Sequence, residues 1–274
     1  MKILLPTDFS KLSKNAVHYA AKLAKELNAE IVLLHVVYID APPRVQVALK
    51  TPRIIDAMIE NAIQNFEALV KELRKEVGNK INVSYKIEKG NPIEDVVETF
   101  AQHNDIDLIV MGTKGASGLK KVLMGSVATA TIRKSSIPVI TVPEYARFKK
   151  IKQIIYASDM LAVNKEINML IQFARLFNSS IHLLHIVPPA SQKKIDRIRI
   201  KNELISKYKY PKIYVHISVN DDVQEAIEEY IADQNADLLA MFTHKPTFFE
   251  ILFGKSVTRE MAFHSRISLL SIKK

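Results

Sequence analysis

Four of the seven glycines in this chain fall within one short stretch, MGTKGASGLKKVLMGS, at positions 111–126. They are Gly112, Gly115, Gly118 and Gly125. Because glycine has no Cβ, it permits a positive φ and lets a ligand approach the backbone closely. An apolar run, IDLIVM, precedes the glycines, and a segment of helical character, GSVATATIRKSS, follows them. A glycine-rich loop between a strand and a helix N-terminus predicts a cradle for phosphate.

Polar side chains in the same loop favour this interpretation. Ser126 would add a hydroxyl donor at the helix start, and Lys114, Lys120 and Lys121 add positive charge nearby. The alternative is a flexible loop that needs glycine only at its turn. One glycine would satisfy that requirement, whereas this loop has four within fourteen residues.

Asp8 is a second candidate ligand, because it directly follows the apolar run KILLPT. A carboxylate at the carboxyl end of a central strand can accept hydrogen bonds from ribose hydroxyls. The alternative role of Asp8 is to cap the helix that follows, and the two roles are compatible in different states.

Several familiar chemistries are excluded by the residues present. The chain has no G-x-x-x-x-G-K-[ST], since Phe249 stands where FGKSV at 253–257 would need its first glycine, and it has no G-x-G-x-x-G. Without cysteine, neither a disulfide nor a cysteine-based metal site or nucleophile exists. The eight histidines form no convergent metal set. His35 is expected to hydrogen-bond locally, while a binding role for His244 is left open.

The elements that position these residues occur twice. Four segments of the first half have counterparts in the second: 2–10 with 152–160, 31–37 with 181–187, 105–113 with 235–243, and 135–143 with 265–273. The offset falls from near 150 for the first two pairs to 130 for the last two. The second copy is therefore expected to lack about twenty residues between its second and third strands.

Within each copy, apolar runs alternate with segments of helical period, which indicates a parallel sheet covered on both faces. Two helices are expected in the first copy over 10–28 and 92–104, and a loop running into a helix is expected within 38–60. Strands of the first copy are expected near 2–7, 30–37, 82–88, 107–112 and 138–142. The predicted domains are 1–146 and 151–274, joined by a linker near 143–150.

Composition sets wider bounds. The 274 residues are 48% hydrophobic and 25% charged, with a formal net charge of +10. That charge favours an anionic partner or is simply a solvated lysine-rich surface. No nucleic-acid signature and no apolar run of about 18 residues is present. Because Pro6 and Asp8 interrupt the first apolar run, we expect no signal peptide and a cytoplasmic protein.

Taken together, PTDFS, LLHV, GNPIEDVV and MG-x2-G-x9-GS followed by PVITV resemble the universal stress protein family. The chain is similar to a tandem member, closely over 1–143 and more weakly over 151–274. The resemblance implies an α/β fold, adenine nucleotide alpha-hydrolase-like, with two tandem open five-stranded parallel sheets of order 3-2-1-4-5 and helices on both faces. It also implies ATP, ADP or AMP bound in the first domain, with or without Mg²⁺.

The family pattern implies a role for individual residues. Asp8 would contact the ribose or adenine, with Pro6 and Thr7 beside it, and Val36 would contact the adenine through backbone and side chain. The nucleoside would be flanked by Met111 and Gly112. The phosphates would be held by Gly115, Gly125, Ser126 and Val127, with Lys114 and Gly118 in the same loop.

The second copy departs from this pattern. At the offset of 130, the positions of Gly112, Gly115, Gly125 and Gly90 hold Phe242, Lys245, Lys255 and Asn220, while Ser256 and Val257 persist. A ring at Phe242 would lie near the place of the nucleoside. Asp159 remains, and Gly254 lies one residue early. We therefore expect that the second domain does not bind ATP in the manner of the first. Another ligand near the aromatic THKPTFFEILF (243–253) is left open, with core packing as the alternative.

Three functions follow from these expectations. The first is a nucleotide-binding regulatory module of a stress response. The second is a slow ATPase or autophosphorylating protein with Ser126 as phosphate acceptor, although no paired base and nucleophile and no acidic cluster for two metals is evident. The third is a nucleotide-free interaction or scaffold protein.

Two assemblies are also expected. The resemblance implies an intramolecular pseudo-dimer in which 138–143 meets 268–273, and a homodimer of the whole chain is a further expectation. No membrane and no nucleic-acid partner is expected.

Overall fold

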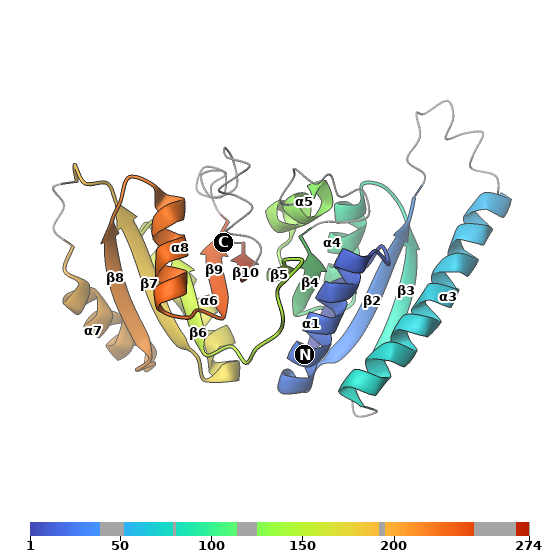
Figure 1. Ribbon diagram of the computed structural model, residues 1–274, viewed down its shortest axis with the longest axis horizontal. Helices are drawn as coiled ribbons and strands as arrows, with labels where there is room; N and C mark the ends of the chain where they lie inside the picture. The colour runs from blue at the N-terminus through green and yellow to red at the C-terminus, as the bar shows by residue number, and fades with distance from the viewer. Residues whose placement is uncertain (39–51, 79–80, 114–124, 192–194, 244–266, 274) are drawn as a thin grey trace. The chain divides into compact units, whose positions relative to one another are not determined.

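In the computed structural model the described residues are 1–38, 52–78, 81–113, 125–191, 195–243 and 267–273. They form two compact units, Met1–Phe148 and Lys149–Lys274 (Figure 1). Each unit is a parallel sheet with helices on its faces. Within the described part of the chain, no helix is long and apolar enough to cross a membrane.

The first unit has the strand order predicted from the sequence. Its strands are β1 (Lys2–Pro6), β2 (Glu30–Val37), β3 (Val83–Lys89), β4 (Leu108–Gly112) and β5 (Val139–Val142). They lie in the order β3-β2-β1-β4-β5, and every neighbouring pair is parallel. The register pairs Leu5 with Leu33 and Ile109 with Val139. The expected order 3-2-1-4-5 is confirmed for this unit.

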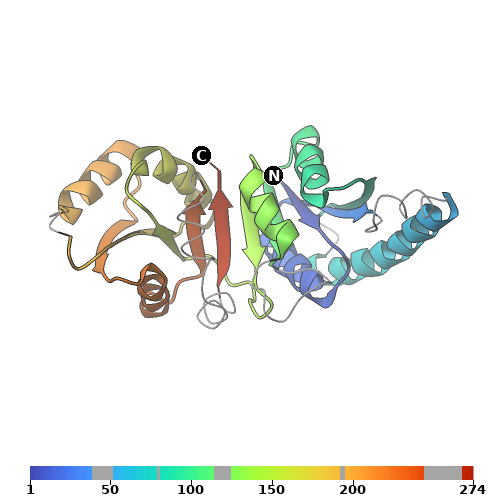
Figure 2. The same cartoon turned by 90° about the horizontal axis from the view of Figure 1, so that it is seen from above.

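The described helices of the first unit are α1 (Lys11–Leu27), α3 (Pro52–Val77), α4 (Ile93–His103) and α5 (Ser126–Lys134). Helix α1 begins where the sequence predicts, because the Ser10 hydroxyl oxygen accepts a hydrogen bond from the Ser13 N–H at 3.2 Å. Helices α1 and α3 cover one face of the sheet, and α4 lies on the other face (Figure 2).

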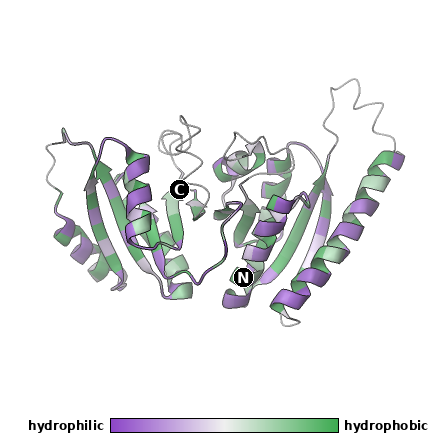
Figure 3. Cartoon of the chain, in the orientation of Figure 1, coloured by the Kyte–Doolittle hydropathy of each residue, from purple (hydrophilic) through white to green (hydrophobic). Residues whose placement is uncertain are grey.

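The core of each unit is formed by buried strand residues and by the apolar sides of the helices that pack on them. Ile3, Leu4 and Leu5 of β1 are all fully buried, as expected for a central strand of a parallel sheet. Figure 3 shows the strands predominantly hydrophobic, whereas the helices alternate hydrophobic and hydrophilic positions.

The second unit repeats the first. Its strands are β6 (Gln153–Ala157), β7 (Ser180–Val187), β8 (Ile213–Val219), β9 (Leu238–Phe242) and β10 (Ser268–Ile272), all parallel in the order β8-β7-β6-β9-β10. Its described helices are α6 (Val163–Phe177), α7 (Arg197–Tyr208) and α8 (Val223–Asp233). The expected order is confirmed here too.

The two units differ most between their second and third strands. Helix α3 has 26 residues, whereas its counterpart α7 has 12. This accounts for most of the roughly twenty residues that the second copy lacks.

The segment predicted to be the linker packs against α1 of the first unit. The Asn15 side-chain amide donates hydrogen bonds to the carbonyl oxygens of Pro143 at 3.1 Å and Ala146 at 3.2 Å. The rings of Tyr19 and Phe148 meet edge to face, with centroids 5.3 Å apart. These contacts anchor the end of the first unit to its own helix. The meeting of the two fifth strands stays a prediction.

Candidate functional site

A cavity of about 230 Å³ opens at the carboxyl ends of the first unit's strands. It lies where β1 is flanked by β2 on one side and β4 on the other, which is the point at which the chain order of the sheet reverses. Open parallel sheets bind ligands at this place. The ends of β1, β2 and β4 and the starts of α1, α4 and α5 contribute its lining.

The structure brings most of the residues predicted for the site together. Nine of them line the cavity: Pro6, Thr7, Asp8, Val36, Met111, Gly112, Gly125, Ser126 and Val127. The other three, Lys114, Gly115 and Gly118, lie outside the described residues, as do Lys120 and Lys121. Residues more than one hundred positions apart in the sequence thus share one cavity.

Sequence reasoning missed seven further lining residues. They are Ser13, Leu34, His35, Tyr38, Ile93, Thr113 and Ala128. For His35 the sequence predicts only a local hydrogen bond. Most of the others are apolar or lie inside an expected helix, so they resemble core residues. Their position in the sequence could have indicated the site, because Tyr38 directly follows the second strand and Ile93 follows GNP at the start of a helix.

Asp8 shapes the turn that enters α1. One carboxylate oxygen, Oδ1, accepts a hydrogen bond from the Ser10 N–H at 3.0 Å, and Ser10 in turn caps the helix. The alternative role predicted for Asp8 was to cap this helix. Ser10 is the N-cap instead, and Asp8 supports Ser10. Its side chain is exposed at the cavity, where a carboxylate can accept hydrogen bonds from ligand hydroxyls.

A buried hydroxyl pair lies beside Asp8. The Thr7 and Ser13 side-chain oxygens are 3.0 Å apart, and the Thr7 hydroxyl oxygen also accepts from the Phe9 N–H at 3.1 Å. Phe9 adopts a positive φ of 61°, which is uncommon for a residue with a Cβ. These bonds hold the loop after β1 in one conformation at the cavity wall.

His35 fixes this loop to the neighbouring strand. Its Nδ1 lies 2.8 Å from the Thr7 carbonyl oxygen, so the N–H at this position donates. The expected local hydrogen bond is confirmed. The second unit repeats it, with His185 Nδ1 at 2.8 Å from the Ser158 carbonyl oxygen. Because the bond occurs in both units, it belongs to the shared architecture of the strand ends.

The N-terminus of α5 faces the cavity without a side-chain cap. Its N-cap is Gly125, which offers no side chain to the first N–H groups, and its first turn contains no acid. The backbone N–H of Gly125 donates to the Thr113 carbonyl at 2.7 Å. Such a helix start is suited to an anion. Since φ of Gly125 is −63°, this position does not need glycine for a left-handed conformation. The missing Cβ instead leaves room for a ligand to approach the backbone.

The electrostatics of the cavity depend on few groups. Among the described lining residues, Asp8 is the one carboxylate. Nowhere in the described residues do three or more His, Asp or Glu side chains gather as a metal site. The described walls therefore offer polar and apolar contacts to a ligand, with the uncapped start of α5 at one side.

The corresponding place in the second unit is filled by protein. Phe242 stands at the position of Gly112, and its buried ring packs edge to face on Tyr156. The Tyr156 hydroxyl donates to Glu166 and accepts from Ser158 at 3.0 Å. Burial raises the pKa of Tyr156, and the hydrogen bond with Glu166 raises it further. In the first unit Leu5 occupies the place of Tyr156, because it pairs with Leu33 of β2 as Tyr156 pairs with Leu183 of β7. Leucine has no hydroxyl with which to form such a network.

One part of the first unit's geometry survives in the second. Asp159 Oδ1 accepts from the Leu161 N–H at 2.9 Å, as Asp8 does from Ser10. The loop positions Lys245, Gly254, Lys255, Ser256 and Val257, together with His244, lie outside the described residues.

The repeated fold and the strand-end cavity of the first unit define a tandem protein of doubly wound parallel α/β units. The model of the universal stress protein family matches residues 1–143 and 152–273. The chain belongs to the universal stress protein family.

Known relatives agree with this assignment. Universal stress protein MJ0531 of Methanocaldococcus jannaschii is 37% identical over 142 residues, which cover 52% of this chain and 81% of the relative. Universal stress protein MJ0577 of the same organism is 34% identical over 52% of this chain and 93% of its own length. A crystal structure of a universal stress protein from Archaeoglobus fulgidus spans 100% of this chain and 96% of its own, with a TM-score of 0.71 and 21% identity. That structure supports the tandem fold.

Proposed function

We propose that the first unit binds an adenine nucleotide, ATP, ADP or AMP, and that the chain acts as a nucleotide-responsive module in a stress response. One observation supports this proposal above all: nine residues expected to bind nucleotide line a single cavity at the carboxyl ends of the strands. The family to which the chain belongs is consistent with it.

The cavity offers a distinct surface to each part of a nucleotide. Its apolar wall, formed by Leu34, Val36, Ile93 and Met111, would receive the base. Asp8 would accept hydrogen bonds from the ribose hydroxyls, because it lies exposed at the rim.

The phosphates would lie over Gly125 and Ser126, where the uncapped start of α5 presents N–H groups. The volume of about 230 Å³ is below the roughly 300–1,000 Å³ of pockets that enclose drug-sized ligands. We therefore propose that the cavity encloses the nucleoside and that the phosphates extend toward the loop after β4.

The two domains would have different roles. Residues 1–146 would form the nucleotide-binding domain, and residues 151–274 a domain of the same fold that does not bind ATP in this manner. The buried ring of Phe242 supports this division, because it lies at the position that glycine leaves open in the first unit. A nucleotide-free interaction role therefore suits the second domain.

Hydrolysis or autophosphorylation would be slow at most. Among the described lining residues, the side chains that could act as a base are Asp8, which is assigned here to the ribose, and His35, whose Nδ1 donates to the Thr7 carbonyl. Mg²⁺, where it accompanies the nucleotide, would be held mainly by phosphate oxygens and water. The location of the protein in the cytoplasm stays a prediction.

The test is thermal unfolding with and without 1 mM ATP, with AMP and GTP in parallel. With a dissociation constant of about 10 µM, ATP should stabilise the first unit by about 2.7 kcal/mol. That corresponds to a shift of roughly 5–10 °C in one of two transitions. Absence of any shift, in protein shown by absorbance to carry no co-purified nucleotide, would contradict the proposal.

A further inference from the structure

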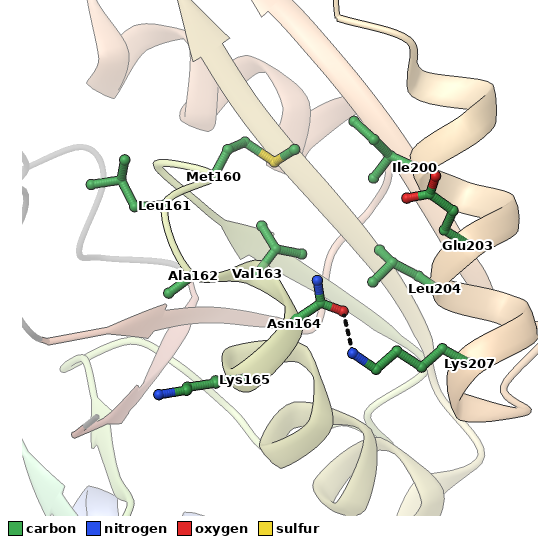
Figure 4. Close-up of a pocket in the computed structure, with 10 residues that line it drawn as sticks. All are labelled: Met160, Leu161, Ala162, Val163, Asn164, Lys165, Ile200, Glu203, Leu204 and Lys207. Carbon is green, nitrogen blue, oxygen red and sulfur yellow. Dashed lines mark hydrogen bonds between the residues drawn. The ribbon is translucent and has the colours of Figure 1, made fainter.

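A groove of about 770 Å³ lies in the second unit between the start of α6 and helix α7. Met160 and Val163 line one wall, and Ile200 and Leu204 line the wall opposite (Figure 4). At one end the Lys207 ammonium donates to the Asn164 side-chain oxygen at 3.0 Å. The groove is distinct from the strand-end cavity of the first unit and plays no part in the proposed nucleotide site.

The groove exists because α7 is short. In the first unit, α3 buries Phe66, Leu69 and Leu73 almost completely. Its far end is tied to α1 by His18 and Glu76, whose side chains are 2.6 Å apart. Of the twelve residues of α7, only Leu204 is buried. The seam that α3 closes against α1 is thus left open between α7 and α6.

The charge around the groove is positive. Of the charged residues that line the groove, Lys165 and Lys207 are basic and Glu203 is acidic. Glu203 is already paired with Arg199 at 3.6 Å. Lys207 bonds to the neutral amide of Asn164, and Lys165 lies along the opposite wall. An acidic occupant would therefore be attracted, whereas a basic one would be repelled.

We propose that this α6–α7 groove docks a short, acidic, amphipathic segment of another protein. Its apolar side chains would pack between Met160, Val163, Ile200 and Leu204, and its carboxylates would pair with Lys207 and Lys165. Recognition of this kind combines apolar anchors with a complementary charged rim. Leu161, an apolar rim residue that is 69% exposed, extends the contact area beyond the groove itself.

A second copy of this chain is a poorer occupant. The chain has a formal net charge of +10, so two copies repel each other. Its own acidic helix, α8, already buries Ala226 and Ile227 beneath its own unit. The two apolar residues that it buries there are not available to the groove of another copy.

The test uses methyl NMR of protein labelled with ¹³C-methyl methionine, one of eight methionines being Met160. The Met160 signal is assigned with Met160→Leu. The probe is a 14-residue amphipathic peptide with leucine at helical spacing and glutamate at the other positions, and the control peptide has lysine for glutamate. We expect the acidic peptide to shift the Met160 signal saturably and the lysine peptide to leave it unchanged. No shift up to 1 mM acidic peptide overturns the proposal.

Two variants of α7 carry the same charge change on different sides of the helix. Lys207 lies at the groove, whereas the Lys201 ammonium lies 5.3 Å from the ring centroid of Tyr214 on β8. Lys207→Glu should weaken peptide binding at least tenfold, and Lys201→Glu less than twofold. Equal weakening would overturn the proposal, because it would show attraction by net charge alone.

Two further measurements complete the test. A Met160 signal that changes with protein concentration in the absence of peptide, together with dimer in sedimentation, would assign the groove to a second copy and overturn the proposal. Lys207→Glu should leave the effect of ATP on thermal unfolding unchanged. A loss of that effect would contradict the independence of the two sites.

Discussion

The ring of Phe242 lies edge to face against the ring of Tyr156, with centroids 5.6 Å apart. Both side chains are buried, and the Tyr156 hydroxyl continues the contact to Glu166 on α6. The same strand position in the first unit is Gly112, which lines the candidate nucleotide cavity. The position that holds Gly112 in the wall of the first unit's cavity therefore holds a core phenylalanine in the second unit.

Phe242→Ala should destabilise the second unit without creating a nucleotide site. Loss of a buried phenylalanine typically costs about 3–5 kcal/mol, and the edge-to-face contact with Tyr156 is lost with it. Denaturant unfolding should show the change in the second unit's transition alone. Titration calorimetry should still find a single site for ATP. A second site of similar affinity would mean that Phe242 alone excludes the nucleotide.

Asp8→Asn and Asp159→Asn form a matched pair. Each aspartate accepts a hydrogen bond from the N–H two residues ahead, so both changes should cost similar, small amounts of stability. Asp8 alone lines the candidate cavity. Because a hydrogen bond to a charged group contributes about 1.5–3 kcal/mol, Asp8→Asn should weaken ATP binding by about tenfold or more. Calorimetry should show no change in ATP affinity for Asp159→Asn. Equal loss of ATP affinity in the two variants would show that Asp8 does not contact the nucleotide.

Gly90 is required for steric reasons. Its φ is +157°, and a Cβ at this position would lie 2.6 Å from Cγ2 of Val96. Gly90→Ala should therefore destabilise the first unit by about 1–3 kcal/mol. Gly78→Ala is the control, because Gly78 also has a positive φ, of +78°, but no atom within 4 Å of the added Cβ. Adding Val96→Ala to Gly90→Ala should recover the stability lost to the clash with Val96. If it does not, the loss of stability comes from the backbone conformation at position 90.

The strands and their ends could be predicted from the sequence, because buried parallel strands are apolar runs and their ends carry turn residues such as Thr7 and Asp8. The cap at Ser10 was predictable for the same local reason. Tyr38 and Ile93 were missed as cavity residues because an apolar side chain at a site has the same pattern as one in a core. Only three-dimensional proximity distinguishes the two.

Glu166 shows a second limit of sequence reasoning. It is almost fully buried and bonded to Tyr156, whereas a glutamate in the first turn of a helix is ordinarily a solvent-exposed residue that favours the helix dipole. Its spacing from Val163, Ile167 and Leu170, all buried, was the available signal. A buried carboxylate needs a partner, and no local pattern names a partner ten residues away on a strand.

The predicted pairing of the two fifth strands can be tested in solution. Each is an edge strand of its own five-stranded order, and unpaired edges are prone to association. Small-angle scattering of the whole chain should give one compact particle, with domains that touch. A profile of two separate, freely moving domains would contradict the pairing.

Protonation of His182 should destabilise the second unit. His182 Nδ1 lies 3.2 Å from the Tyr230 hydroxyl and Nε2 lies 2.9 Å from the Gln153 side-chain oxygen. Burial lowers the pKa of His182 below 6.5, and the neighbouring His216 lowers it further. The folded state therefore favours the neutral imidazole. Its contribution to stability is complete above pH 6.5 and is lost as the pH falls from there through the folded pKa.

Unfolding between pH 8 and pH 5 measures this effect. The free energy of unfolding of the second unit should decline below about pH 6.5. His182→Phe keeps an aromatic ring against Tyr214, which stacks on His182 at 4.9 Å, and should reduce the decline. Part of it should persist, because burial also lowers the pKa of His216. His103→Gln, which removes an exposed imidazole of the first unit, is the control. An unchanged slope in His182→Phe would show that His182 is not the group whose protonation destabilises the fold.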